Sequence, residues 1–335
     1  MILSQEEFEK KYIEVHNLVS EGDEQLVRNY LIKSLIDDPL NLLRFRCSVH
    51  HQTNENDLEE SYKIINQLTF ELYNTRYVSY NEVNHYFEKL YKFLDENIKE
   101  MIDRKEYNYA FQLINYIVSK VEEAVMYGND DEYLIIDLID KLWKKVIKGS
   151  TNEDKEELFY WFADHLEEYE CFEDKIEEIF LNEFYGEMFH DGQLYVIKQQ
   201  LKKYKEDPNS NYKVEYWSLK YLELLQKYHY TEDEINKFRK QYWKYGSIRN
   251  YYYELYMENK DYTLALQVLN DNIAIDYDNC RLITKYQKQK KDLYLLIGNQ
   301  KAYINQLYQI LYNFDTGDFK TYLELKKCYD EKEWK

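Results

Sequence analysis

The sequence predicts an all-α protein, an α-solenoid in which pairs of helices stack on one another. The chain has 335 residues but only 8 glycines and 2 prolines, too few for the tight turns of a β-sandwich, a barrel or an α/β fold. Apolar residues recur every three or four positions along most of the chain, as on one face of a helix. No alternating β-branched segment lies between glycine or proline turns, so we expect essentially no sheet.

The apolar stripes follow one another with little interruption. In chain order they are Leu58, Tyr62, Ile65, Thr69 and Leu72; Val83, Tyr86, Phe87, Leu90 and Leu94; Leu134, Leu138, Leu142 and Val146; Leu158, Phe159, Phe162 and Leu166; Phe172, Ile176, Ile179, Phe180 and Phe184; and Ile235, Phe238 and Tyr242. A serine or threonine with glutamate three residues later, the spacing of a capping box, predicts helix starts at Ser4, Ser79 and Thr231.

The stretch Arg249–Asn270, RNYYYELYMENKDYTLALQVLN, contains two stripes with a short polar break at 258–261. Tyr252, Leu255 and Tyr256 precede the break, and Tyr262, Ala265, Leu266, Leu269 and Ile273 follow it. A break this short forces the two helices to lie antiparallel, and the small Ala265 is where they approach most closely.

The turn in this stretch occurs a second time, because Lys105–Ile114 matches Lys260–Leu269 in residue type at most positions. Each copy begins with Lys and an acidic residue, continues with Tyr, and has Ala three residues after the Tyr. This order resembles a tetratricopeptide repeat, which has a turn, an aromatic residue and a small residue at the helix crossing. The Trp, Leu-Gly and closing Pro of that pattern are missing, so we predict degenerate tetratricopeptide-like helix-turn-helix repeats.

The expected organisation is an N-terminal helical segment at 1–80 and a helical-repeat region at 81–335. Pro208 and the neighbouring Asn and Ser residues predict a bend near 206–211. The whole chain would then form a stack of about seven helix pairs with a concave groove.

Charge bears on the class of partner. The chain has 63 Asp and Glu against 44 Lys and Arg, a net charge of −19, which repels phosphate backbones at long range. Nucleic acid is therefore not the favoured partner. The clusters Lys141–Lys148, Lys198–Lys205 and Lys285–Lys291 keep it open as an alternative, since they would line up as one basic stripe on a solenoid. The other interpretation of these lysines is that they balance an acidic chain.

Cysteine usage and the N-terminus indicate a soluble cytoplasmic protein. Cys47, Cys171, Cys280 and Cys328 lie far apart without a metal or redox motif, which suits a reducing compartment. The N-terminus has neither a basic nor an apolar signal region, and no apolar run is long enough to span a membrane. We expect no membrane partner.

Catalytic signatures are lacking. The pair His165 and Glu168 has helical metal-ligand spacing but no matching pair on another helix, and His50, His51 and His190-Asp191 have no partner motif. No glycine-rich phosphate loop and no nucleophile elbow occur. We therefore expect no enzymatic activity, no cofactor and no metal.

The candidate binding residues come from residue type. The 38 tyrosines favour either an aromatic partner surface or a genome that uses Tyr where others use Leu or Phe. As partner-binding residues we consider Trp217, Trp243, Tyr253, Lys285, Lys288, Lys290 and Lys291. For the three aromatic residues, packing in the core is the competing interpretation.

A family resemblance adds to this picture. Residues 291–335, Lys105–Ile114 and 158–184 (LFYWFADHLEEYECFEDKIEEIFLNEF) resemble the helical region that follows the zinc module of SWIM zinc-finger proteins of low-GC Gram-positive bacteria, over roughly residues 86–335. The resemblance depends on the spacing of Tyr303 and Leu307 and on the ending Leu325-Lys326-x-x-Tyr329-x-x-x-Glu333-Trp334. The chain has no C-x-C or C-x-H, so zinc is not carried over. What the resemblance implies is a stand-alone bacterial adaptor.

The expected function is a non-catalytic scaffold or adaptor that binds a segment of a partner protein in a helical-repeat groove. Two alternatives stay open, a peptide-sensing helical-repeat regulator and a nucleic-acid-binding solenoid that uses the Lys clusters.

Overall fold

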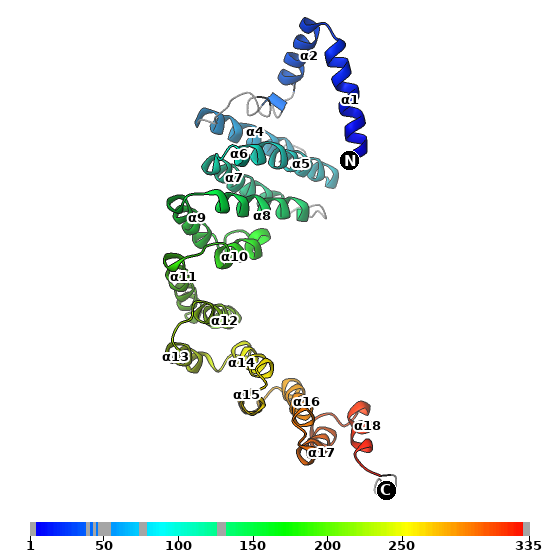
Figure 1. Ribbon diagram of the computed structural model, residues 1–335, viewed down its shortest axis with the longest axis vertical. Helices are drawn as coiled ribbons and strands as arrows, with labels where there is room; N and C mark the ends of the chain where they lie inside the picture. The colour runs from blue at the N-terminus through cyan, green and yellow to red at the C-terminus, as the bar shows by residue number, and fades with distance from the viewer. Residues whose placement is uncertain are drawn as a thin grey trace. The chain divides into compact units, whose positions relative to one another are not determined.

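The computed structural model describes residues 5–37, 41, 42, 45, 55–73, 79–125 and 132–330, and these residues form helices and turns without a β-strand (Figure 1). The predicted all-α solenoid class is confirmed. The first helices along the chain are α1 (Gln5–Glu21), α2 (Glu24–Asp37), α4 (Glu55–Tyr73), α5 (Tyr80–Phe93), α6 (Lys99–Asp103), α7 (Tyr107–Val125), α8 (Glu132–Gly149), α9 (Asn152–Asp164) and α10 (Glu173–Asn182). They are followed by α11 (Glu187–Lys205), α12 (Asn211–Lys227), α13 (Glu232–Tyr242), α14 (Gly246–Glu258), α15 (Tyr262–Ile275), α16 (Cys280–Leu296), α17 (Gln300–Gln309) and α18 (Phe319–Lys327).

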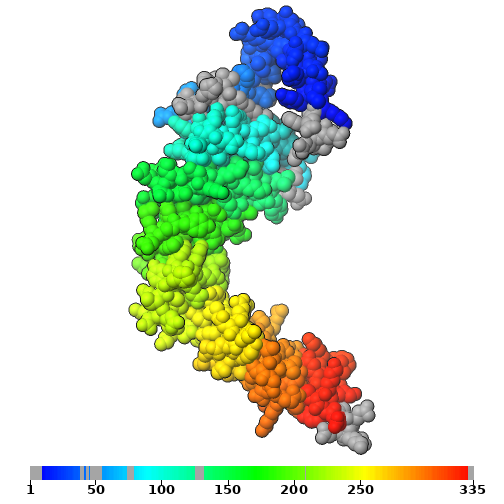
Figure 2. Space-filling model, viewed as in Figure 1, coloured from blue at the N-terminus to red at the C-terminus, as the bar shows by residue number. Residues whose placement is uncertain are grey.

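The chain divides into two compact units, residues 1–189 and 190–335. Within each unit the colours of Figure 2 follow one another in sequence order, so each segment packs against its neighbours along the chain. The boundary expected at residue 80 stays a prediction, although α4 packs against both α5 and α7. The segment 206–211 contains a 3₁₀ turn, Pro208–Ser210, between α11 and α12.

Helices of the first unit stack in pairs. Helix α4 contacts α5 and α7, α5 contacts α8, and α7 contacts α8, so α4 and α7 form one layer and α5 and α8 form the other. Between α5 and α6 the chain makes a π-helical turn, Leu94–Ile98. Trp143 of α8 is fully buried, with its ring 5.3 Å from Phe162 and 5.9 Å from Phe172, so α8, α9 and the turn before α10 share one aromatic core.

Helices of the second unit pack in succession: α14 on α15, α15 on α16, α16 on α17, and α17 on α18. Arg249 of α14 is fully buried and holds several of these helices together. Its Nη1 donates to the Trp243 and Lys244 carbonyls at the end of α13, at 3.0 and 2.7 Å. Its Nη2 donates to both carboxylate oxygens of Asp276, each at 2.7 Å, just after α15. The buried guanidinium is stable in the core because all of its N–H donors form hydrogen bonds.

Left-handed turns join consecutive helices in both units. Residues with positive φ stand at Lys105, His229, Lys260 and Gly298, each directly after a helix. At Lys260 the backbone N–H donates to the Met257 carbonyl (3.1 Å), and the Asp261 N–H donates to the Tyr256 carbonyl (2.8 Å). These bonds form a Schellman motif, which caps the free carbonyls at a helix end.

The same pair of backbone bonds occurs in the other three turns. At Lys105 they join Lys105 to Ile102 and Glu106 to Met101, each at 2.9 Å, and α7 begins at the next residue, Tyr107. Both predicted Lys-acid-Tyr turns are therefore confirmed as bends between neighbouring helices. The sequence comparison missed the related turns at His229 and Gly298, since these lack the Lys.

Two of the predicted capping boxes are confirmed, at Ser79 with Glu82 and at Thr231 with Glu234. The third, at Ser4, lies outside the described residues. A box at Thr151 was missed because aspartate, Asp154, takes the place of glutamate. Most apolar stripes are buried as predicted, but Leu134 is 57% exposed. Helix α8 packs on both α5 and α7, so its buried face instead runs through Ile135, Ile136, Ile139 and Leu142.

Replacing the left-handed lysines by glycine should stabilise the protein. A side chain in this conformation costs about 1–2 kcal/mol, which glycine avoids, although glycine also makes the unfolded chain more flexible. We expect Lys105→Gly and Lys260→Gly each to raise the free energy of unfolding by about 0.5–1 kcal/mol, measured by urea denaturation. Lys240→Gly, inside α13, is the control and should lower it by about 1 kcal/mol. A lower free energy of unfolding in all three variants would contradict this expectation for the turns.

Candidate functional site

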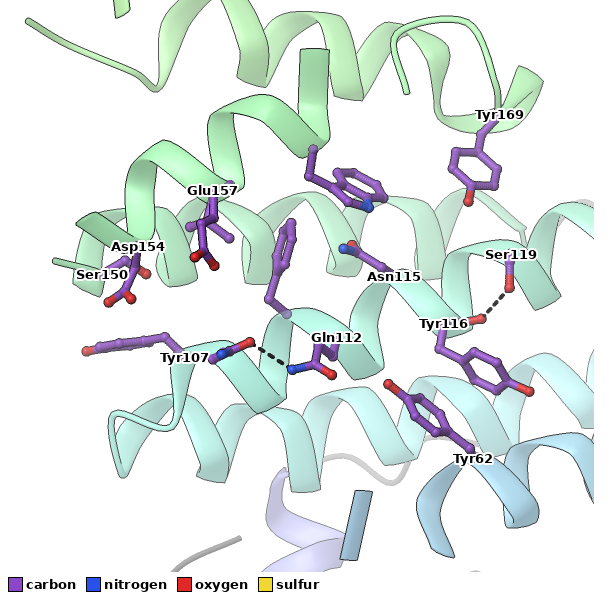
Figure 3. Close-up of a pocket in the computed structure, with 14 residues that line it drawn as sticks. Tyr62, Tyr107, Gln112, Asn115, Tyr116, Ser119, Ser150, Asp154, Glu157 and Tyr169 are labelled. Atoms are coloured by element: carbon purple, nitrogen blue, oxygen red, sulfur yellow. Dashed lines mark hydrogen bonds between the residues drawn. The ribbon is translucent and has the colours of Figure 1, made fainter. Parts of the chain in front are cut away.

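A cavity of about 660 Å³ opens in the first unit along α7, with α4 on one side and α9 on the other (Figure 3). This volume is within the range of ligand-binding clefts. The residues that line the cavity are Tyr62, Tyr107, Asn108, Phe111, Gln112, Asn115, Tyr116, Ser119, Ser150, Asp154, Glu157, Leu158, Trp161 and Tyr169. We call this cavity the α7 groove.

The floor of the α7 groove is a polar stripe on α7. Asn108, Gln112, Asn115 and Ser119 recur every three or four residues and therefore share one helix face. Gln112 Nε2 donates to Asn108 Oδ1 at 2.8 Å, and Trp143 Nε1 donates to Asn115 Oδ1 at 2.8 Å. These bonds fix the orientation of the amides, which both donate and accept hydrogen bonds.

An aromatic wall covers one side of the groove. Phe111 is buried, and its ring meets Trp161 edge-on with centroids 5.3 Å apart. Trp161 stacks on His165 at 4.2 Å, and His165 lies parallel to Tyr169 at 5.9 Å. The rings thus continue in a row from α9 into the turn before α10, where they offer flat apolar surface.

One end of the groove is acidic. Figure 3 shows Asp154 and Glu157 of α9 close to Ser150 and to Tyr107, which begins α7. One carboxylate oxygen of Asp154 accepts the Thr151 N–H and hydroxyl in the capping box. Among the described residues that line the groove, none is Lys or Arg. This end therefore favours a positively charged group.

Tyrosines surround the opposite end. Tyr62 of α4 and Tyr116 of α7 have ring centroids 4.5 Å apart, and the Tyr116 hydroxyl donates to Asn66. Burial raises the pKa of Tyr62, and Tyr116 raises it further, so the hydroxyl stays protonated.

Glu122, near the end of α7, fixes the turn that carries Tyr169. Its carboxylate accepts the backbone N–H groups of Glu170 (2.8 Å) and Cys171 (3.2 Å). Burial raises the pKa of Tyr169, with smaller contributions from Glu168 and Glu122. Burial and Glu122 raise the pKa of Cys171 to about 12, so this thiol is a poor nucleophile.

The three aromatic residues considered from the sequence lie in the second unit, outside this groove. Trp217 of α12 is only 3% exposed and packs in the core. Trp243 is half-buried, donates to Asp271 at 3.0 Å, and lines a smaller cavity of about 380 Å³ with Arg239 and Gln267. Tyr253 packs against the core formed by Ala265, Leu269, Tyr286 and Leu293.

The candidate lysines of α16 are largely engaged within the chain. Lys288 Nζ lies 2.8 Å from both Asp315 and Asp318, and Lys291 Nζ lies 2.6 Å from Glu324. Lys290 donates to Asn270 at 2.9 Å, and among these four lysines only Lys285 is exposed. These contacts hold α16 to α15, to α18 and to the turn before α18.

The histidines considered as ligands have other contacts. His165 Nε2 is 3.4 Å from Glu168 but the ring belongs to the aromatic wall, and His190 stacks on Tyr228 at 3.4 Å. His50 and His51 lie outside the described residues. No three His, Cys, Asp or Glu side chains gather as a metal site in the described ranges. No helix in those ranges combines the length and apolar character needed to cross a bilayer.

The chain matches no protein-family model and no curated protein. The resemblance to SWIM-associated helical regions therefore stays a prediction.

The α7 groove was not predicted from the sequence, although its central helix begins just after the predicted turn at Lys105. The spacing of Asn108, Gln112 and Asn115 places them on one polar face of α7, opposite its buried face, and this was the signal in the sequence. A polar stripe on an amphipathic helix is usually solvated, and the walls from α4 and α9 become visible only in three dimensions.

Gly149, the last residue of α8, allows Tyr107 to reach its position at the acidic end. A Cβ added to Gly149 would overlap the Tyr107 ring. We expect Gly149→Ala to lower the free energy of unfolding by about 1–3 kcal/mol. In a Tyr107→Ala background the same change should be neutral or stabilising by up to about 1 kcal/mol, since alanine is the better helix former. Denaturation of the four proteins of this double-mutant cycle tests the contact, and additive effects would contradict it.

Asp318 should make the second unit sensitive to acid. Burial would raise its pKa, but hydrogen bonds from Lys288 and Thr321 outweigh burial and hold the pKa well below its ordinary value. Asp318 therefore contributes to the free energy of unfolding above about pH 4, its pKa in the unfolded chain, and this contribution is lost as the pH falls below that value. We expect Asp318→Asn, which keeps an N-cap residue, to be less stable by about 1–2 kcal/mol at neutral pH. In urea denaturation this difference should shrink toward pH of about 2, whereas the exposed control Asp278→Asn should match wild type throughout.

Proposed function

We propose that the protein is a non-catalytic adaptor whose α7 groove binds an extended segment of a partner protein with a basic residue at one end. The observation that carries the proposal is the polarity of the groove, with fixed amides along the floor, carboxylates at one end and tyrosines at the other.

The floor has a length that suits a short peptide. From Asn108 to Ser119 the helix rises about 17 Å at 1.5 Å per residue. An extended chain rises about 3.3 Å per residue, so about five residues would span the floor. Side-chain amides in a row satisfy the backbone N–H and C=O groups of such a segment, which has no partners of its own.

The charge and the rings give the segment its direction. A Lys or Arg side chain of the ligand would lie near Glu157 and the free oxygen of Asp154, and the adjoining apolar side chains would pack on Phe111 and Trp161. A nucleic-acid backbone suits the groove poorly, because its phosphates would meet two carboxylates and no cation.

A binding role is also supported by the lack of reactive groups along the groove. The titratable residues that line it are Asp154, Glu157 and tyrosines. His165 extends the row of rings from Trp161 but is not among the described lining residues, and neither is a Cys. The thiols of Cys171, Cys280 and Cys328 are free, which suits the reducing cytoplasm where we place the protein.

A peptide-sensing regulator is the second candidate, and the acidic end favours it, since two carboxylates also suit the free α-amino group of a short peptide. The two functions differ in whether a free terminus is needed. Acetylating the N-terminus of a bound peptide should leave the affinity unchanged for an adaptor and weaken it for a sensor.

Selection of peptides from a random displayed library on the purified protein tests the proposal. We expect enriched sequences to carry Lys or Arg at one end and an aromatic or aliphatic residue within about five positions. Affinities of a selected peptide should fall about tenfold for Glu157→Lys, because like charges then meet. The matched control, Glu156→Lys, changes the neighbouring exposed residue on α9, which does not line the groove, and should stay within about twofold. Acidic selected peptides, or equal effects of the two variants, would overturn the proposal.

A further inference from the structure

A second cavity lies in the second unit between α11 and α13 and has the opposite charge. Its volume is about 350 Å³. Lys198, Leu201, Lys202, Lys205, Glu206, Phe238, Gln241 and Tyr242 line it. We call it the lysine groove.

Three lysines form one edge of the lysine groove. Lys198, Lys202 and Lys205 are exposed and stand at helical spacing on one face of α11. The ammonium of Lys205 lies 4.4 Å from the centre of the Tyr242 ring, and that of Lys198 lies 5.4 Å from the Tyr221 ring. Phe238 connects these rings, with centroids 4.5 Å from Tyr221 and 4.4 Å from Tyr242.

These lysines differ from those of α16 in how their charge is balanced. Lys288 and Lys291 each contact two carboxylates. Within the described part of the chain, Lys198, Lys202 and Lys205 form no ion pair, although the protein carries a net charge of −19. Hydrogen bonds from Thr231 lower the pKa of Glu234, and Lys198 helps to lower it further. A ring face orients an ammonium without neutralising it, so these charges remain available to a ligand.

We propose that the lysine groove binds an acidic segment of a partner protein. Along α11 the three lysines are separated by about 6 Å and about 4.5 Å. Alternate side chains of an extended peptide are about 7 Å apart and lie on the same side. A segment with Asp or Glu at every second position would therefore place a carboxylate at successive ammonium groups, with Phe238 and Leu201 beneath its apolar atoms.

An acidic peptide fits this groove better than a single-stranded nucleic acid does. Proteins that bind single strands stack bases on open aromatic faces. Here Lys205 lies over Tyr242 and Lys198 over Tyr221, so the ring faces at the lysines are occupied. None of the described lining residues is an Arg that could make bidentate contact with phosphate, and Glu206 lies at one end.

The inference is independent of the α7 groove, which lies in the first unit and selects the opposite charge. Loss of one binding activity should leave the other intact. Glu157→Lys should weaken binding of the basic peptide alone, and reversal of the three lysines should weaken binding of the acidic peptide alone.

Fluorescence anisotropy of the full chain tests the proposal with a labelled peptide of alternating glutamate and serine, a lysine-serine peptide, and a short oligothymidylate. The triple variant Lys198→Glu, Lys202→Glu, Lys205→Glu should weaken the affinity for the glutamate-serine peptide by about tenfold or more. The control reverses Lys141, Lys145 and Lys148, which are exposed on α8 at the same spacing, and so carries the same net charge. The single variant Lys202→Glu, a lysine without a ring contact in the described residues, is measured in case the triple variant unfolds.

The expected result is salt-sensitive binding of the glutamate-serine peptide that the α11 variants weaken and the α8 control leaves within about twofold. An equal loss of affinity in the α8 control would show that the effect comes from the net charge of the protein, and it would overturn the proposal. Tighter binding of oligothymidylate than of the glutamate-serine peptide, or no binding of the peptide by wild type, would overturn it as well.

Discussion

The left-handed residue at a helix end is the constraint on which the rest of the described structure depends. Lys105 and Lys260 reverse the chain within two residues, because each Lys and the acidic residue after it close one helix with two backbone hydrogen bonds, and the residue that follows begins the next helix. Helices joined this way must pack against each other. Fully buried alanines, Ala110 and Ala265, follow at the same distance from the turn, and their small side chains allow neighbouring helices to pack closely. The free-energy cost of the left-handed backbone conformation is offset by contacts along the whole helix pair.

The α7 groove follows from the same turn. Since α7 begins at Tyr107, two residues after Lys105, the turn sets the helix rotation that buries Ala110 and Ile114 and leaves Asn108, Gln112 and Asn115 on the open face. It also places Tyr107 at the first position, where the absence of a side chain at Gly149 makes room for its ring. The polar floor, the acidic end and the core are therefore coupled through one helix, so groove variants must be separated from stability variants by their controls.

The spacing of apolar residues could predict the helices because one face of each helix is buried. It could not always predict which face is buried, as Leu134 shows. Leu134 is apolar but exposed, since the rotation of α8 is set by two neighbours and not by its own sequence. The turns at His229 and Gly298 share backbone geometry with Lys105 and not residue type, so matching letters could not find them. The grooves could not be predicted because their walls come from helices distant in the sequence. Whether a lysine is paired, as Lys288 is, or only lies over a ring, as Lys205 does, likewise depends on partners that no local pattern identifies.

Charge in this chain is arranged locally, and the local arrangement bears more on binding than the net value does. Coulombic interactions between exposed groups fall off within about 8–10 Å at physiological salt. A ligand in either groove therefore experiences mainly the side chains around it, not the excess of carboxylates elsewhere. Two carboxylates lie at the end of the α7 groove, where none of the described lining residues is Lys or Arg, and three lysines, two of them over aromatic rings, line the lysine groove. They create fields of opposite sign in separate units. An acidic protein can for this reason select an acidic segment in one groove, provided that the lysines there have not already been neutralised as Lys288 and Lys291 of α16 have.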